Sequence, residues 1–99
     1  MLVRFPAPAK ARPAVVLTRD DMIPHLGRIT IAPISSTIRA ATSEVVLGID
    51  DGMKAPCAVN LFNIATVTKA MLGRRIATLS PVRMRQICNA TEFALGCLD

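Results

Sequence analysis

Aromatic side chains are scarce in this sequence, which has three Phe and no Tyr or Trp among its 99 residues. A protein that binds single strands by stacking bases needs aromatic platforms, so extensive stacking is excluded as the main binding mode. Histidine is limited to His25, in a loop flanked by Pro and Gly. One histidine excludes a His-pair ribonuclease mechanism and a multi-histidine metal site within one chain. We expect His25 to be an ordinary loop residue and the protein to need no metal or other cofactor.

The sequence also lacks the signals of several other protein classes. The three cysteines, Cys57, Cys88 and Cys97, are odd in number and lack CxxC spacing, which argues against a disulfide framework and a zinc site. We expect them to be buried thiols in a reducing compartment. Walker A, GxGxxG and GxSxG motifs do not occur. No apolar run reaches the roughly 20 residues of a membrane span, and the N-terminus does not resemble a signal peptide. We therefore expect a cytoplasmic protein.

Basic residues are in excess, with twelve Lys and Arg against seven Asp and Glu and a net charge of +5. Such a surface favours a polyanion, most often through phosphate contacts. The acids fall mainly in two pairs, residues 20–21 and residues 50–51. The second pair precedes Gly52, and Asp-Gly is a strong turn signal. We interpret both pairs as solvated turns rather than as a catalytic carboxylate pair.

Short β-branched runs dominate the chain, which we take as a single domain covering residues 1–99. Residues 2–5 form an apolar piece that stops at Pro6, and two prolines predict a loop over residues 6–10. Predicted strands cover residues 14–18, 28–34, 44–47, 57–61, 64–68 and 76–79. Pro33 cannot donate to a ladder, so it should lie at a strand end or at an irregularity.

One helix is predicted at the C-terminus. Ser80 is a good N-cap and Pro81 suits the first helical position. Residues 82–95 then carry apolar side chains at near-helical spacing, with charged and polar side chains between them. The apolar positions are Val82, Ile87, Ala90 and Ala94, and those expected to face solvent are Arg83, Arg85 and Gln86. Strands followed by one helix indicate a mainly β protein, a small and partly open β-barrel with a helix packed on it. Its exposed sheet edge makes a homodimer plausible.

The remaining candidates for chemistry are basic residues and hydroxyls. Arg12 precedes the strand predicted at residues 14–18, while Ser35 and Ser36 follow the strand predicted at residues 28–34. If these two strands pair antiparallel, the start of one meets the end of the other. A guanidinium and one or two hydroxyls would then face one concavity, and that set suits a phosphodiester on which charge builds.

Five segments, in order, resemble those of the MazF/PemK toxins of bacterial toxin–antitoxin pairs. Residues 12–18 (RPAVVLT) are similar to the family's RPAVVLS strand, and residues 31–37 (IAPISST) to the segment that ends its next core strand. Residues 51–57 (DGMKAPC) resemble the family's "dGL-kpS" turn, residues 59–67 (VNLFNIATV) its "vnldqirtv" strand, and residues 74–80 (RRIATLS) the approach to its last helix. Asn63 stands where Gln is common, and the loop before Arg12 is unusually short.

The resemblance implies an SH3-like, partly open β-barrel that acts as a homodimer and cuts single-stranded RNA without metal. The 2′-hydroxyl would attack the neighbouring phosphate and leave 2′,3′-cyclic phosphate and 5′-hydroxyl ends. By position, Arg12 matches the family's catalytic arginine and Ser35 its catalytic hydroxyl. A guanidinium stays protonated in proteins, so we assign Arg12 to binding the developing charge.

The resemblance also implies RNA contacts and a protein partner. The residues expected to bind RNA are Lys10, Ser36, Arg39 and Asn63. The partner would be a MazE-like antitoxin whose acidic tail fills the RNA groove, which the net charge of +5 makes reasonable.

Two alternatives remain open at this point. A non-catalytic RNA-binding module of small barrel fold would keep the basic surface, although the shortage of aromatics argues against it. An interaction protein, including a gyrase-directed toxin of the related barrel type, could share the fold without RNA cleavage. Arg12 and Ser35 favour the nuclease.

Overall fold

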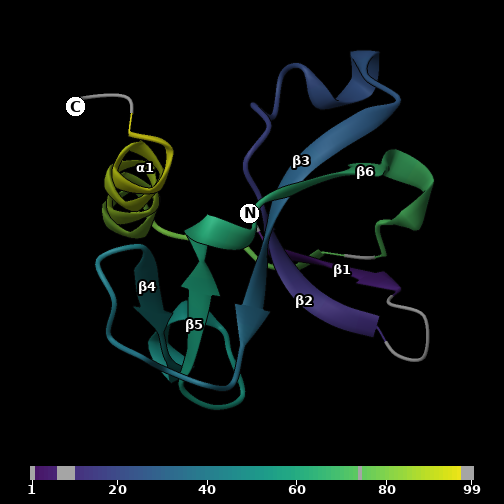
Figure 1. The fold of residues 1–99 in the computed structure, drawn as a ribbon. Helices are drawn as coiled ribbons and strands as arrows, with labels where there is room; N and C mark the ends of the chain where they lie inside the picture. The colour runs from purple at the N-terminus through teal and green to yellow at the C-terminus, as the bar shows by residue number, and fades with distance from the viewer. Residues whose placement is uncertain (1, 7–10, 74, 97–99) are drawn as a thin grey trace.

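The computed structural model describes residues 2–6, 11–73 and 75–96, and Figure 1 shows their arrangement. Within these residues the strands and the α-helix are β1 (Leu2–Pro6), β2 (Ala11–Val16), β3 (Arg28–Ser35), β4 (Glu44–Leu47), β5 (Cys57–Asn60), β6 (Ala65–Thr68), β7 (Arg75–Ala77) and α1 (Pro81–Leu95). Single-turn 3-10 helices connect them: η1 (Ile23–His25), η2 (Ile49–Asp51), η3 (Leu61–Asn63) and η4 (Lys69–Met71). No helix in the described part of the chain is long and apolar enough to cross a membrane.

The strands form one antiparallel sheet in the order β4-β5-β3-β2-β1-β7, with β6 added to the edge of β3. Figure 1 shows β1, β2 and β6 on one side of the long strand β3, with β4, β5 and helix α1 on the other side. No pairing among the described residues joins β4 to β7, so the sheet curves without closing. The prediction of a mainly β, partly open barrel with a C-terminal helix is confirmed.

Strand β3 changes partner along its length. Its first half, residues 28–31, pairs with β6, whereas Ile34 and Ser35 pair with β5. Pro33 lies between these two ladders, at the point where the edge of β3 has no ladder partner. The predicted irregularity at Pro33 is therefore confirmed, and its lack of an N–H fits a site where the sheet divides.

Two hydrophobic clusters lie on the two faces of β2. Val15 is buried in the larger cluster with Leu47, Leu61 and Ile87, while Ala14 and Val16 are buried in a smaller cluster. Successive residues of a strand point to opposite faces, so an uninterrupted apolar run is what a strand buried on both faces requires. Burial of each of these larger aliphatic side chains contributes about 1.5–3 kcal/mol.

Most strand boundaries differ from the predictions by one to three residues, and three differences affect the interpretation. Residues 2–6 form a strand between β2 and β7, so Pro6 ends a strand rather than opening a loop, and residues 7–10 of that loop lie outside the described residues. Strand β2 begins at Ala11, so Arg12 lies within the strand rather than before it. The strand predicted at residues 57–61 ends at Asn60, whose side chain accepts a hydrogen bond from the Phe62 N–H at 3.0 Å and so begins η3.

The helix prediction is confirmed at its N-terminus. The Ser80 hydroxyl accepts a hydrogen bond from the Arg83 N–H at 3.2 Å, and Pro81 is the first helical residue. Ile87 and Ala90 are buried as predicted, but Val82 is 62% exposed. The spacing of Val82 is helical, yet its side chain faces solvent, so that prediction was wrong.

Candidate functional site

A pocket of about 510 Å³ opens where β2 begins and β3 ends. Its lining residues come from these two strands, from the turn between β4 and β5, and from β7. They are Arg12, Pro13, Ile34, Ser35, Ser36, Gly52, Met53, Lys54, Ala55, Pro56, Cys57 and Ile76. None of the described residues that line the pocket is acidic, whereas Arg12 and Lys54 are basic, so this lining carries positive charge.

The pairing of β2 with β3 brings Arg12 and Ser35 to the same place. The strands are antiparallel, with Ala14 opposite Pro33 and Val16 opposite Ile31. Two more residues along each strand in this register place Arg12 opposite Ser35, and both line the pocket. The predicted meeting of the start of one strand with the end of the other is confirmed.

Both side chains are available to a ligand. Arg12 is exposed, and its guanidinium has no hydrogen-bond or ion-pair partner within the described part of the chain. Ser35 is also exposed, and its hydroxyl accepts a hydrogen bond from the Thr37 N–H at 3.1 Å. That bond engages a lone pair of Oγ and leaves the hydroxyl proton free to donate. The pair thus offers a fixed positive charge and an O–H donor to one anionic group.

Lys54 also lines the pocket, from the turn between β4 and β5, and the sequence analysis did not select it. It adds a second basic side chain to the lining. The signal was present, because Lys54 lies in the Asp-Gly turn that resembles the family's "dGL-kpS" segment. It was missed because nothing local shows that this turn shares a pocket with Arg12.

The inner wall of the pocket is apolar. Pro13, Ile34, Met53 and Ile76 contribute to it, together with the buried Cys57. The Cys57 thiol lies 3.9 Å from the Leu47 carbonyl oxygen. Burial raises the pKa of Cys57 above 9.0, and the negative charge of Asp51 raises it further. Cys57 is therefore a protonated thiol at neutral pH rather than a nucleophile.

The expectation that all cysteines are buried holds only in part. Cys57 is buried as predicted, whereas Cys88 is exposed on helix α1. Cys88 follows the buried Ile87 by one position, which turns it about 100° away from the core-facing side of the helix. Cys97 lies outside the described residues. No group of three or more His, Cys, Asp or Glu side chains that could hold a metal ion occurs in the described ranges.

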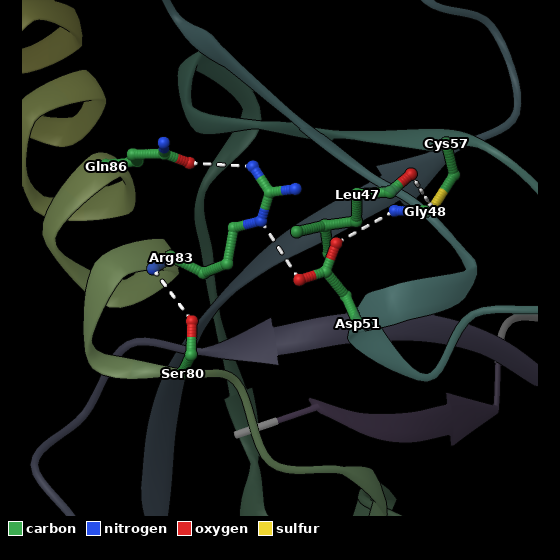
Figure 2. A network of polar contacts seen from close by, with 7 residues as sticks. All are labelled: Leu47, Gly48, Asp51, Cys57, Ser80, Arg83 and Gln86. Carbon is green, nitrogen blue, oxygen red and sulfur yellow. Dashed lines mark hydrogen bonds and ion pairs between the residues drawn. The ribbon is translucent and has the colours of Figure 1, made fainter.

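The turn that carries Lys54 is tied to helix α1, as Figure 2 shows. Asp51 accepts a hydrogen bond from the Gly48 N–H at 2.9 Å and forms an ion pair with Arg83 at 2.9 Å from Nε to Oδ1. The Asp51 side chain is only 9% exposed. We expected the turn at residues 50–51 to be solvated and Arg83 to face solvent. That expectation was wrong for Asp51 and Arg83, which form an ion pair with each other. A charged partner from an element 32 residues away is what permits the burial.

The pKa of Asp51 reflects opposing effects. Burial by itself raises the pKa of its carboxyl group. The hydrogen bond from Gly48, together with the hydrogen bond and the charge of Arg83, outweighs burial and holds the pKa below its usual value of 3.8. Asp51 is thus ionised at neutral pH and does not serve as a proton donor.

The other predicted RNA-binding residues are distributed differently. Ser36 lines the pocket beside Ser35. Arg39 and Asn63 are exposed but do not line it, and the Arg39 N–H donates to Glu44 Oε1 at 2.9 Å. Lys10 lies outside the described residues. His25 is exposed on η1, as expected for a loop residue.

Residues 2–95 match the family of PemK-like, MazF-like toxins of type II toxin–antitoxin systems. The chain belongs to the PemK/MazF toxin family.

Relatives of known sequence and structure agree with this membership. The chain is 46% identical over 87 residues to the probable endoribonuclease MazF5 of Mycobacterium tuberculosis, covering 87% of this chain and 80% of that protein. It is 40% identical over 88 residues to endoribonuclease MazF3 of the same organism, covering 85% of each. The Mycobacterium tuberculosis toxin MazF-mt6 superposes with a TM-score of 0.88 at 31% identity over 97% of each chain. An endoribonuclease from a mycobacterial species, in complex with its cognate antitoxin, superposes with a TM-score of 0.85 at 25% identity over 96% of this chain and 90% of that one.

Proposed function

We propose that this protein is a metal-independent, sequence-selective endoribonuclease toxin that cleaves single-stranded RNA and is neutralised by a cognate antitoxin. The observation that carries the proposal is the placement of Arg12 and Ser35 in one positively charged pocket. The family relatives are named endoribonucleases, which supports RNA as the substrate. A phosphodiester is the group that a guanidinium, an ammonium and a hydroxyl bind together.

The proposed reaction is an internal transfer within the RNA. The 2′-oxygen loses its proton and bonds to the neighbouring phosphorus, while the bond from phosphorus to the 5′-oxygen breaks and that oxygen gains a proton. The products are a 2′,3′-cyclic phosphate and a 5′-hydroxyl. Negative charge builds on the non-bridging oxygens during the step. Arg12 stabilises that charge as a permanent cation, and Ser35 donates a second hydrogen bond to it.

The proposal includes protein partners and a location. A net charge of +5 suits an acidic antitoxin segment, and one structural relative is described in complex with its cognate antitoxin. The edge strand β4 leaves backbone groups available for a second copy of the chain, which supports a homodimer. An RNA substrate supports action in the cytoplasm.

The test is cleavage of a mixed RNA pool in excess EDTA by the wild type, Arg12→Ala and Arg28→Ala. Arg28 is an exposed arginine at the opposite end of β3 and does not line the pocket, so it is the matched control. We expect the wild type and Arg28→Ala to leave cyclic-phosphate and 5′-hydroxyl ends, and Arg12→Ala to lose about 10²–10³ in rate.

Two results would count against the proposal. Loss of cleavage on adding EDTA would remove the metal-independent mechanism. Absence of cleavage by a folded, antitoxin-free wild type would favour the alternative of an interaction protein.

A further inference from the structure

The turn between β4 and β5, residues 48–56, forms part of the wall of the pocket that Arg12 and Ser35 also line. Five of its residues line the pocket, including Lys54. Inside the turn, the Gly52 N–H donates to the Ile49 carbonyl at 3.0 Å and the Met53 N–H to the Gly48 carbonyl at 3.3 Å. These bonds fix the shape of the turn but not its position relative to the rest of the molecule.

One of the contacts that hold the turn in position comes from helix α1. The ion pair from Arg83 to Asp51 joins this turn to α1. Asp51 is three residues from Lys54 and is mostly buried, so its carboxylate cannot shift without losing the hydrogen bond from Gly48 or the ion pair. Movement of Asp51 would therefore move the wall that carries Lys54.

Arg83 is itself held in place, as Figure 2 shows. Its backbone N–H donates to the Ser80 hydroxyl at 3.2 Å. Its guanidinium donates from Nη1 to Gln86 Oε1 at 3.0 Å and from Nε to Asp51 at 2.9 Å. A guanidinium bound at two points has a defined direction, which a flexible ammonium would lack. Arg83 therefore connects the first turn of α1 rigidly to the pocket wall.

We propose that Arg83 and Asp51 are positioning residues that set the place of Lys54 relative to Arg12 and Ser35, so that the first turn of α1 controls RNA binding in the pocket. This inference rests on the proposed function. It goes beyond that function because neither Arg83 nor Asp51 lines the pocket. The physical reason is that a phosphate bound by two cations from different elements is sensitive to the distance between those elements.

The first test compares Arg83→Gln with Arg85→Gln. Arg85 is exposed on the same helix, so both variants lose the same charge and keep long-range attraction of RNA equal. Measurements are cleavage kinetics and the affinity for an oligonucleotide with a 2′-deoxy nucleotide at the scissile position. For Arg83→Gln we expect a rise of about tenfold in KM and in the dissociation constant, with little change in kcat. Arg85→Gln should resemble the wild type, and Arg83→Lys should recover part of the loss. Equal effects of Arg83→Gln and Arg85→Gln would overturn the inference.

A second test asks whether Arg83 acts through Lys54. In a Lys54→Ala background, Arg83→Gln should add little further loss of affinity, because the group being positioned has gone. If the two substitutions lower the affinity independently, so that their effects multiply in the double variant, Arg83 does not act through Lys54.

A third test does not depend on RNA. Hydrogen exchange of the Gly48, Gly52 and Met53 amides should be faster in Arg83→Gln than in the wild type or Arg85→Gln. Unchanged protection of these amides would overturn the inference even if the protein cleaves RNA. Failure of the wild type to cleave or bind RNA, with exchange as expected, would instead contradict the proposed function.

Discussion

Gly52 lies directly against Ala77 of strand β7. A Cβ atom built on Gly52 would stand 2.8 Å from the Cβ of Ala77, closer than two such atoms approach in proteins. Gly52 also has a φ of +89°, in the left-handed region that residues with a side chain rarely adopt. The turn that forms one wall of the pocket therefore packs closely against β7 at Gly52, which has no side chain.

The Gly52→Ala variant should be less stable than the wild type. Backbone strain alone costs about 1–3 kcal/mol, and the contact with Ala77 adds to it. Gly48→Ala is the matched control, because Gly48 lies in the same turn and a Cβ there meets nothing within 4 Å. Urea denaturation measures both. Equal stability of the two variants would show that the close approach to Ala77 does not matter.

The Ser35 hydroxyl should be needed for cleavage, in addition to any structural role of Ser35 at the end of β3. Removing a hydroxyl that donates to the transition state costs about 10²–10³ in rate, so Ser35→Ala should show that loss. Ser35→Thr keeps the hydroxyl and should retain most activity, while Ser36→Ala should lose less than Ser35→Ala. Single-turnover cleavage gives the rates. Circular dichroism checks the fold, because Ser35 also accepts a hydrogen bond from Thr37. A full rate in folded Ser35→Ala would remove Ser35 from the mechanism.

Asp51 should stabilise the protein in a pH-dependent way. Its pKa in the folded state lies below 3.8, so the ionised carboxylate contributes stability above that pH, and this contribution is lost as the pH falls through the lower folded value. Asp51→Asn should therefore be less stable than wild type at neutral pH, with the difference shrinking in acid. Urea denaturation across the range from neutral to about pH 2 tests this. Asp50→Asn, at an exposed neighbour, should show a smaller difference from wild type. A constant difference between Asp51→Asn and wild type at every pH would contradict the prediction.

The two described cysteines should differ in reactivity. Cys57 is buried and its raised pKa keeps it protonated, whereas Cys88 is exposed. Near pH 8, iodoacetamide should modify Cys88 at least about tenfold faster than Cys57 in the folded protein. Peptide mapping by mass spectrometry distinguishes the sites. Denaturant should abolish most of the difference. A fast reaction of Cys57 in the native protein would indicate that the inner wall of the pocket opens readily.

The sequence predicted best those features whose partners lie close in the chain. Helix α1 begins where Ser80 and Pro81 indicate, because an N-cap and the residue it caps are three positions apart. Strand β4 covers the predicted residues, and the Asp-Gly turn after it is a turn in the structure. Strand ends were less certain, since pairing with distant strands decides them. Strand β2 extends back through Arg12 because β1 pairs with it there.

Part of the site could also be predicted without coordinates. Arg12 and Ser35 meet because two apolar strands pair antiparallel, and the resemblance to MazF/PemK toxins had marked both residues. Arg39 and Asn63 were expected to bind RNA but do not line the pocket, since the chain order of motifs does not fix which loops share one end of a curved sheet. Lys54 was overlooked for the same reason.

The sequence by itself therefore determined the family, the open antiparallel sheet with its C-terminal helix, and the arginine and serine on adjoining strands. It could do so because strand patterning, helix capping and short motifs are local properties of the chain. The tertiary structure alone decided that Lys54 faces the pocket, that Asp51 is buried, and that Arg83 holds it. Each of these depends on elements far apart in sequence packing together, and a charged side chain leaves water only where such packing supplies its partner.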